Sequence, residues 1–219
     1  MGAKERNKRY RTRHPAVYYL LDFDFKLRDG TWFREAEISI EGKRYKVLSK
    51  AAVIWNNIKQ RTRVGSAYQK QKKFYAGTRL AFKDFQDFCD FCQVTPGYDL
   101  KDEQGRNYAL DKDLLGKDEI RAYSKEACCF LPTKINSALT KQKKNKNDGD
   151  LPSGIVITKG KYRVRDGRGG RDYYLNTLEE AIKTKNMLLA NRLESYLPDV
   201  SYDQRVVEAL KSKIEELRS

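Results

Sequence analysis

Two stretches near the start of the chain are rich in β-branched and aromatic residues. Residues 17–25 (VYYLLDFDF) and 32–48 (WFREAEISIEGKRYKVL) combine such residues with polar ones. Arg28-Asp29-Gly30 and Glu41-Gly42 interrupt them with residues that favour turns. Because β-branched and aromatic side chains suit a pleated, half-buried surface, the pattern predicts short antiparallel strands joined by turns.

Two further segments repeat apolar residues at the spacing of a helix. Ser49 is a suitable N-cap for a helix that runs to about Arg61, and one face of that helix would carry Ala52, Ile54, Trp55 and Ile58. Phe82 to Cys92 (FKDFQDFCDFC) places aromatic residues and cysteines at the same spacing. This second pattern predicts a buried amphipathic helix, because its apolar side chains return to one face every three or four residues.

The pattern after the lysine-rich residues 141–150 predicts a small antiparallel sheet. Strands are expected at Gly154–Thr158, Lys161–Arg165 and Asp172–Leu175, with a glycine-rich hairpin loop before the last of them. Period two places Lys161, Arg163 and Arg165 on one face of the middle strand. Tyr162 and Val164 would then point towards a helix, at Ala181, Met187 and Leu188.

Two helices are expected after this sheet. Thr177 followed by Glu180 has the spacing of a capping box and begins a helix that runs to about Tyr196. Pro198 ends that helix, because proline lacks the amide that the next turn needs. A last helix is expected over residues 202–217.

The chain is therefore predicted to have an α+β fold in five parts. These parts are a flexible basic arm (1–15), a β-rich segment (16–48), a mixed α/β domain (49–140), a linker (141–150) and a C-terminal domain (151–219).

Charge narrows the class of partner. The net charge is +15, and lysines and arginines are concentrated in three runs. Residues 1–13 hold six of them, residues 42–83 hold twelve and no acid, and Lys134–Lys146 holds five lysines and no acid. Such runs favour a polyanion, and we expect double-stranded DNA. No apolar run approaches the ~20 residues of a membrane span, so we expect a cytoplasmic protein without a membrane partner.

The four cysteines are expected to be small core side chains. Cys89 and Cys92 have the spacing of half a zinc site, but adjacent Cys128 and Cys129 do not supply the other half. The one histidine, His14, lies in the basic arm. We therefore expect neither a structural zinc nor a disulfide framework.

Four short motifs stand in order along the middle of the chain. They are WNNIKQRT, YAGTRLAFKDFQDF, LDKDLL and YSKEACCFLPTKIN, between Trp55 and Asn136. In this order they resemble the HNH endonucleases of phages, which include homing endonucleases. The resemblance implies a ββα-metal core at residues 49–140 that clasps one divalent ion, magnesium or manganese, and hydrolyses phosphodiester bonds.

The resemblance also implies roles for single residues. Asp111 stands at the metal-binding Asp, Lys112 where the catalytic His belongs, and Ala127 where the family often has Asn. Lys is frequent at this place in phage proteins of this kind. Lys112 would act as a base only in its neutral form, and as a cation it would stabilise the transition state. Asp113, as a second carboxylate, and Asn136 complete the candidate catalytic set.

The C-terminal segment LPSGIVITKGKYRVRDGRGGRDYYLNTLEEAIKTKN resembles a DNA-binding domain of the APETALA/ethylene-response type. That resemblance implies a three-stranded sheet, backed by a helix, that lies in the major groove. The residues expected to bind DNA are Lys161, Arg163, Arg165, Arg168, Arg171 and Tyr173. The basic run nearer the start adds Lys59, Arg61, Arg63, Lys70, Lys72, Lys73 and Arg79.

Three functions fit these features. The first is a metal-dependent DNA endonuclease whose C-terminal sheet selects the site. The second is a DNA-binding regulator or accessory factor on a nuclease scaffold that no longer cuts. The third is an RNA-binding protein, which would prefer single strands or RNA to duplex DNA. The target sequence and the oligomeric state are left open.

Overall fold

The computed structural model describes residues 17–66, 75–116, 121–140, 151–167 and 170–219. The predicted arm and linker lie outside these residues. The chain forms two compact units: Met1–Val94 with Arg121–Lys125, and Thr95–Ile120 with Glu126–Ser219. Both helices and small sheets are present, so the predicted α+β class is confirmed.

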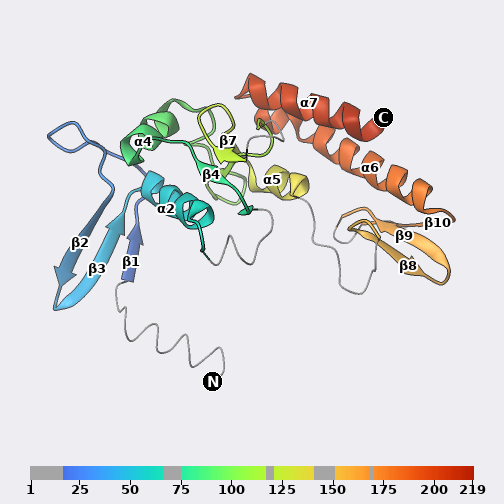
Figure 1. The fold of residues 1–219 in the computed structure, drawn as a ribbon, viewed down its shortest axis with the longest axis horizontal. Helices are drawn as coiled ribbons and strands as arrows, with labels where there is room; N and C mark the ends of the chain where they lie inside the picture. Colours follow the sequence, from blue (N-terminus) through green and yellow to red (C-terminus); the bar gives the residue numbers. More distant parts are fainter. Residues whose placement is uncertain (1–16, 67–74, 117–120, 141–150, 168–169) are drawn as a thin grey trace. The chain divides into compact units, whose positions relative to one another are not determined.

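A three-stranded sheet begins the first unit (Figure 1). It contains β1 (Val17–Leu20), β2 (Glu35–Ile40) and β3 (Lys43–Leu48) in the order β1-β3-β2. β2 and β3 form the predicted antiparallel hairpin, with positive φ angles of 51° at Glu41 and 76° at Gly42 in its turn. β1 is parallel to β3, so the prediction that every strand here is antiparallel was wrong. A strand pattern shows that a segment is extended, but does not show which edge it joins.

Two helices make the core of the first unit. In α2 (Lys50–Thr62) the Ser49 side chain accepts the amide of Ala52, as a cap at this position was expected to do. α4 (Phe85–Val94) begins later than predicted, because Asp84 accepts the amide of Asp87 and caps the helix. The two helices share a core of aromatic rings: Trp55, Phe82, Phe85, Phe88 and Phe91 are all buried. β4 (Arg79–Leu80) pairs in parallel with β6 (Ala122–Tyr123).

The second unit begins with two strands and a helix. β5 (Ala109–Asp111) pairs antiparallel with β7 (Cys129–Leu131), and α5 (Thr133–Leu139) follows β7 directly. Their buried side chains join those of the C-terminal helices in one core, made of Cys129, Leu131, Ile135, Ala190, Leu193, Val200, Val206, Leu210 and Ile214. Residues on both sides of the predicted linker thus belong to one unit, and the predicted domain boundary stays a prediction.

The C-terminal sheet has the predicted strands. β8 (Ile155–Thr158), β9 (Lys161–Arg165) and β10 (Asp172–Leu175) are antiparallel in the order β10-β9-β8. α6 (Leu178–Ser195) follows, and the Thr177–Glu180 capping box at its start is formed. After a 3-10 turn, η2 (Leu197–Val200), α7 (Gln204–Arg218) ends the chain. The sequence therefore predicted the three strands and the two α-helices of this region to within a few residues, but not η2.

α6 belongs to two cores. Near its start, Ala181 packs with Ile155 and Val164 of the sheet. Near its end, Ala190 and Leu193 pack with α7 and with β7 and α5. Met187 was expected under the sheet, but it is half-exposed, since the helix turns it away from the Ala181 face.

All four cysteines are buried thiols, as their expected place in the core requires. Burial raises the pKa of Cys89 to about 12, which keeps this thiol protonated at neutral pH. Among the helices described, none has the length and apolar character needed to cross a membrane.

Candidate nucleic-acid interface and candidate catalytic centre

The middle strand of the C-terminal sheet separates apolar from basic side chains. Val164 is buried against Ile155 and Ala181, on the face towards α6. Lys161, Arg163 and Arg165 therefore lie on the opposite face, because side chains alternate along a strand. This confirms the predicted separation. We call this the outer face of the sheet.

The neighbouring strands add to the outer face. Arg163 lies between Val156 of β8 and Tyr174 of β10, and Tyr174 is half-exposed. Arg165 lies opposite Asp172. The outer face therefore combines three basic side chains with one carboxylate and one aromatic ring.

Tyr173 was expected on this face, and the register shows that it is not there. Its partner on β9 is Val164, so Tyr173 lies on the side of α6, where the Arg171 guanidinium stands 5.6 Å from the centre of its ring. The aromatic residue of the outer face is Tyr174. The sequence contained a signal for this: Leu175 is apolar, so Tyr173, two residues away, shares its inward face.

Asp172 holds the arginines of the outer face. Its two oxygens accept hydrogen bonds from Arg165 Nε at 2.7 Å and Nη2 at 2.9 Å. Arg163 Nη1 lies 3.7 Å from Asp172 Oδ2. The hydrogen bond from Arg165 lowers the pKa of Asp172, so this carboxyl is ionised at neutral pH.

The loop after β9 is tied to α6. Arg192 Nη2 donates to Asp166 Oδ1 at 2.7 Å. Gly167 has a φ of +69°, and a Cβ there would stand 3.1 Å from Arg192 Nη2, so both the turn and the close approach favour glycine. Arg168, in the same loop, lies outside the described residues.

The candidate catalytic carboxylate lies at the end of β5. Asp111 is 8% exposed, and its Oδ1 accepts the amides of Asp113 at 2.9 Å and Leu114 at 2.8 Å. Burial raises the pKa of Asp111, against the opposing effect of these amides, and the charge of Asp113 raises it further. The two amides fix the orientation of the carboxylate and shape the loop that follows β5.

Lys112 and Asp113 lie beside it. Lys112 is 6% exposed, and its ammonium forms an ion pair with the exposed carboxylate of Asp113. Gly116 closes the loop, since a Cβ there would come within 2.5 Å of the Lys112 carbonyl. Ala127 is buried beside Gly116. Its position in the sequence is the one where the phage HNH endonucleases that this segment resembles often have Asn.

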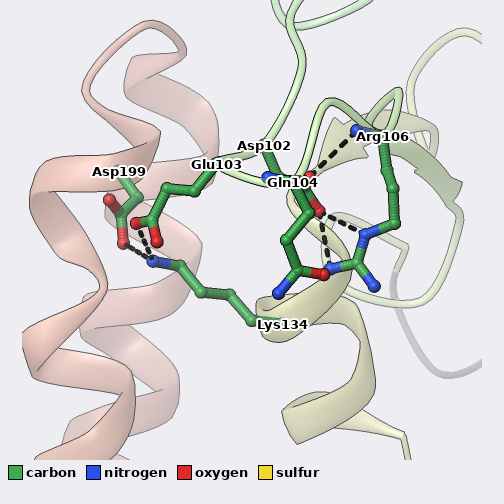
Figure 2. A network of polar contacts seen from close by, with 6 residues as sticks. All are labelled: Asp102, Glu103, Gln104, Arg106, Lys134 and Asp199. Carbon is green, nitrogen blue, oxygen red and sulfur yellow. Dashed lines mark hydrogen bonds and ion pairs between the residues drawn. The ribbon is translucent and has the colours of Figure 1, made fainter.

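Asn136 lies on α5, and a polar network holds that helix in place (Figure 2). Lys134 Nζ lies 2.8 Å from Asp199 and 3.6 Å from Glu103, so it joins α5 to η2 and to the loop before β5. Asp102 folds that loop by accepting the amides of Gln104 and Arg106. The structure therefore fixes the position of α5 relative to β5, although no hydrogen bond joins the Asn136 side chain to Asp111 within the described residues.

The carboxylates at this centre are Asp111, whose Oδ1 already accepts two amides, and Asp113, which pairs with Lys112. Within the described residues there is no group of three or more histidine, cysteine or carboxylate side chains that could hold a metal ion. The metal expected at Asp111 stays a prediction.

Among the basic residues of the first unit that were predicted to bind DNA, one has contacts within the protein and others are exposed. Arg61 Nη1 donates to the Tyr123 hydroxyl at 3.1 Å, and its guanidinium lies 5.4 Å from the centre of the Tyr75 ring. These contacts give Arg61 a structural task beside β6. Lys59, Arg63 and Arg79 are exposed, while Lys70, Lys72 and Lys73 lie outside the described residues.

Comparisons of this chain with family models, with curated proteins and with solved structures find no match.

Proposed function

We propose that the protein binds double-stranded DNA through the outer face of the sheet β8–β10. The observation that carries the proposal is the segregation of side chains on β9, where Lys161, Arg163 and Arg165 share the face that α6 does not cover. A sheet that is buried on one face and basic on the other suits a polyanion. The residue pattern of this region, which resembles APETALA-type domains, supports the same reading.

The chemistry of the face favours duplex DNA over single strands. Arginine can donate two parallel hydrogen bonds to the edge of a guanine or to a phosphate. Single-strand binding depends on several exposed rings on which bases stack, and this face presents one half-exposed ring, Tyr174. RNA or single-stranded DNA is therefore the competing ligand in the test.

Fluorescence anisotropy of the full chain with a labelled duplex of about 30 base pairs tests the proposal. The double variant Arg163→Ala/Arg165→Ala should lose about a hundredfold in affinity, since each good arginine contact is worth ~1–3 kcal/mol. The matched control is Lys183→Ala/Lys211→Ala, which removes two positive charges from exposed positions on α6 and α7. Equal losses in the two variants, or tighter binding to single strands or RNA, would contradict the proposal.

DNA cleavage of the HNH type is a second candidate function, and the β5–β7–α5 arrangement favours it. An antiparallel strand pair followed by a helix, with an aspartate at the end of the first strand, is what the resemblance to phage HNH endonucleases implies. A bound divalent ion would stabilise negative charge on the phosphate. Asp111, the carboxylate at the end of β5, is the residue that would hold such an ion. Lys112 is ion-paired, so the role it fits is that of a cation beside the phosphate and not that of a base.

Nicking of supercoiled plasmid with magnesium or manganese tests this second function. Asp111→Asn is the informative variant, because its amide oxygen can still accept the two backbone hydrogen bonds while the charge is lost. Nicking by the parent protein that disappears in Asp111→Asn supports the endonuclease. Salt-sensitive duplex binding without nicking would instead favour a DNA-binding protein on a nuclease scaffold.

A further inference from the structure

The contact between Arg165 and Asp172 does more than pair two charges. Asp172 uses both oxygens on the Nε and Nη2 groups of a single arginine, across adjacent strands. Such a two-point contact fixes the plane of the guanidinium as well as its position. A long side chain on an open sheet face would otherwise sample many rotamers.

This contact occupies one edge of the Arg165 fork and leaves the other. The Nη1–Nη2 edge still offers two parallel N–H groups, the pattern that matches O6 and N7 of guanine in the major groove. The carboxylate itself accepts hydrogen bonds and repels phosphate oxygens. Arg165 is therefore arranged for a base edge more than for the phosphate backbone.

Arg163 shows the contrast within the same face. It lies 3.7 Å from one Asp172 oxygen, without a two-point contact, and stands between Val156 and Tyr174. Lys161, at the start of β9, has a compact ammonium that suits phosphates as a point charge. Of these three basic side chains, Arg165 is thus oriented by a two-point contact with a carboxylate, and Arg163 and Lys161 are not.

We propose that Asp172 is a specificity-determining residue, which presents Arg165 to a guanine and discourages phosphate contact. This inference rests on the proposed binding of duplex DNA by the outer face. It adds a division of labour to that function: Arg165 with Asp172 selects the sequence, and the remaining basic residues supply affinity that does not depend on sequence.

The test begins with selection of duplexes from a random library by the full chain, followed by affinity measurements on the selected site and on a version with its preferred guanine replaced. Asp172→Ala should reduce the affinity ratio between these two sites roughly tenfold. Affinity for an unrelated duplex should stay equal or rise a few-fold, because a negative charge has been removed. Glu179→Ala, which removes an exposed carboxylate from the first turn of α6, should leave the ratio unchanged.

Arg165→Lys provides a second variant that keeps the positive charge but lacks the fork. It should lose preference at the same base pair as Asp172→Ala does, with nearly the parent affinity for unrelated duplex. An unchanged ratio in Asp172→Ala, or a guanine preference that survives in Arg165→Lys, overturns the role of Asp172 even though the protein binds DNA. A parent chain that binds no duplex, or selects no sequence, overturns the proposed function and this inference with it.

Discussion

The second unit contains two small strand-and-helix arrangements that treat their charged residues in opposite ways. In β5–β7–α5, Asp111 and Lys112 are 8% and 6% exposed and have partners within the protein. On the outer face of β8–β10, Lys161 and Arg165 are exposed on a surface that α6 leaves open. A buried charge must be held by internal contacts, so its loss should affect folding or its dependence on pH. An exposed charge costs little to hold, so its loss should affect binding.

The largest effect is expected from the same substitution in the two cores. Ile135 of α5 and Ile155 of β8 are both fully buried, and Ile135 belongs to the larger cluster. Isoleucine to alanine should cost about 2–5 kcal/mol at either position, with Ile135→Ala at the upper end because more neighbours lose contacts. Urea unfolding followed by far-UV circular dichroism measures both. A larger cost for Ile155→Ala would show that the small sheet core is the stronger of the two.

Tryptophan fluorescence provides the control for that experiment. Trp32 and Trp55 are the two tryptophans of the chain, and both belong to the first unit. Their emission reports the unfolding of the first unit. When the two units unfold independently, neither alanine variant should shift the urea midpoint of that transition.

Replacing a buried cation and an exposed cation with alanine, each in its own variant, sharpens the comparison. Lys112→Ala should lower the free energy of unfolding by about 1–2 kcal/mol, since it removes a buried aliphatic stem along with the charge. Arg165→Ala should lower the free energy of unfolding less than Lys112→Ala does, because its ion pair with Asp172 lies at the surface. Duplex affinity should fall more in the second variant than in the first. The reverse pattern would place DNA at the β5 loop.

Asp111 should give the β5 loop a pH dependence that the sheet lacks. Its pKa lies above the ordinary value of 3.8, so the folded protein binds this proton more readily than the unfolded chain does. The contribution of this carboxyl to stability is therefore full below its unfolded pKa and is lost as pH rises through the folded one. Asp111→Asn should be at least as stable as the parent at pH 7, and its advantage should shrink towards pH 4.

Unfolding experiments across pH 4–7 measure this difference. Asp172→Asn is the matched control, because the pKa of Asp172 is lowered and the sign is opposite. If Asp111→Asn is destabilised equally at every pH, the buried charge is not the source of the effect.

A small effect on the free energy of unfolding is expected at the helix caps. The Thr177 side chain accepts the amide of Glu180 in α6, whereas Pro132, the N-cap of α5, makes no side-chain hydrogen bond to that helix. Thr177→Ala should therefore cost about 1 kcal/mol. Calorimetry of the full chain measures it, and no change in the melting temperature would mean that tertiary packing alone holds the start of α6.

Much of the C-terminal region was predictable because its signals are local. The capping box at Thr177 depends on residues three apart, and the alternation around Val164 depends on residues two apart. Tyr173 was predicted on the outer face together with Arg168 and Arg171, but the strand register pairs it with Val164 and places it on the opposite face.

Long-range features were not predictable in the same way. The parallel pairing of β1 with β3 depends on how the chain returns from Leu20 to Glu35, which no local pattern specifies. The hydrogen bond from Arg61 to Tyr123 joins residues far apart in sequence, so the sequence did not show it. The run of basic residues around Arg61 suggested a DNA contact instead. The resemblance placed Asp111 at a metal-binding position, but only the structure shows that Asp111 ends β5 and that its Oδ1 already accepts two amides.

Lysine labelling of the full chain, with and without a duplex of about 30 base pairs, tests the central claim most directly. Lys161 lies on the outer face, and Lys183 and Lys211 are exposed elsewhere in the same unit, so one mass-spectrometric experiment contains its own controls. The account predicts that DNA protects Lys161 from acetylation and leaves Lys183 and Lys211 as reactive as before. Equal labelling of Lys161 in the presence of bound duplex would contradict it.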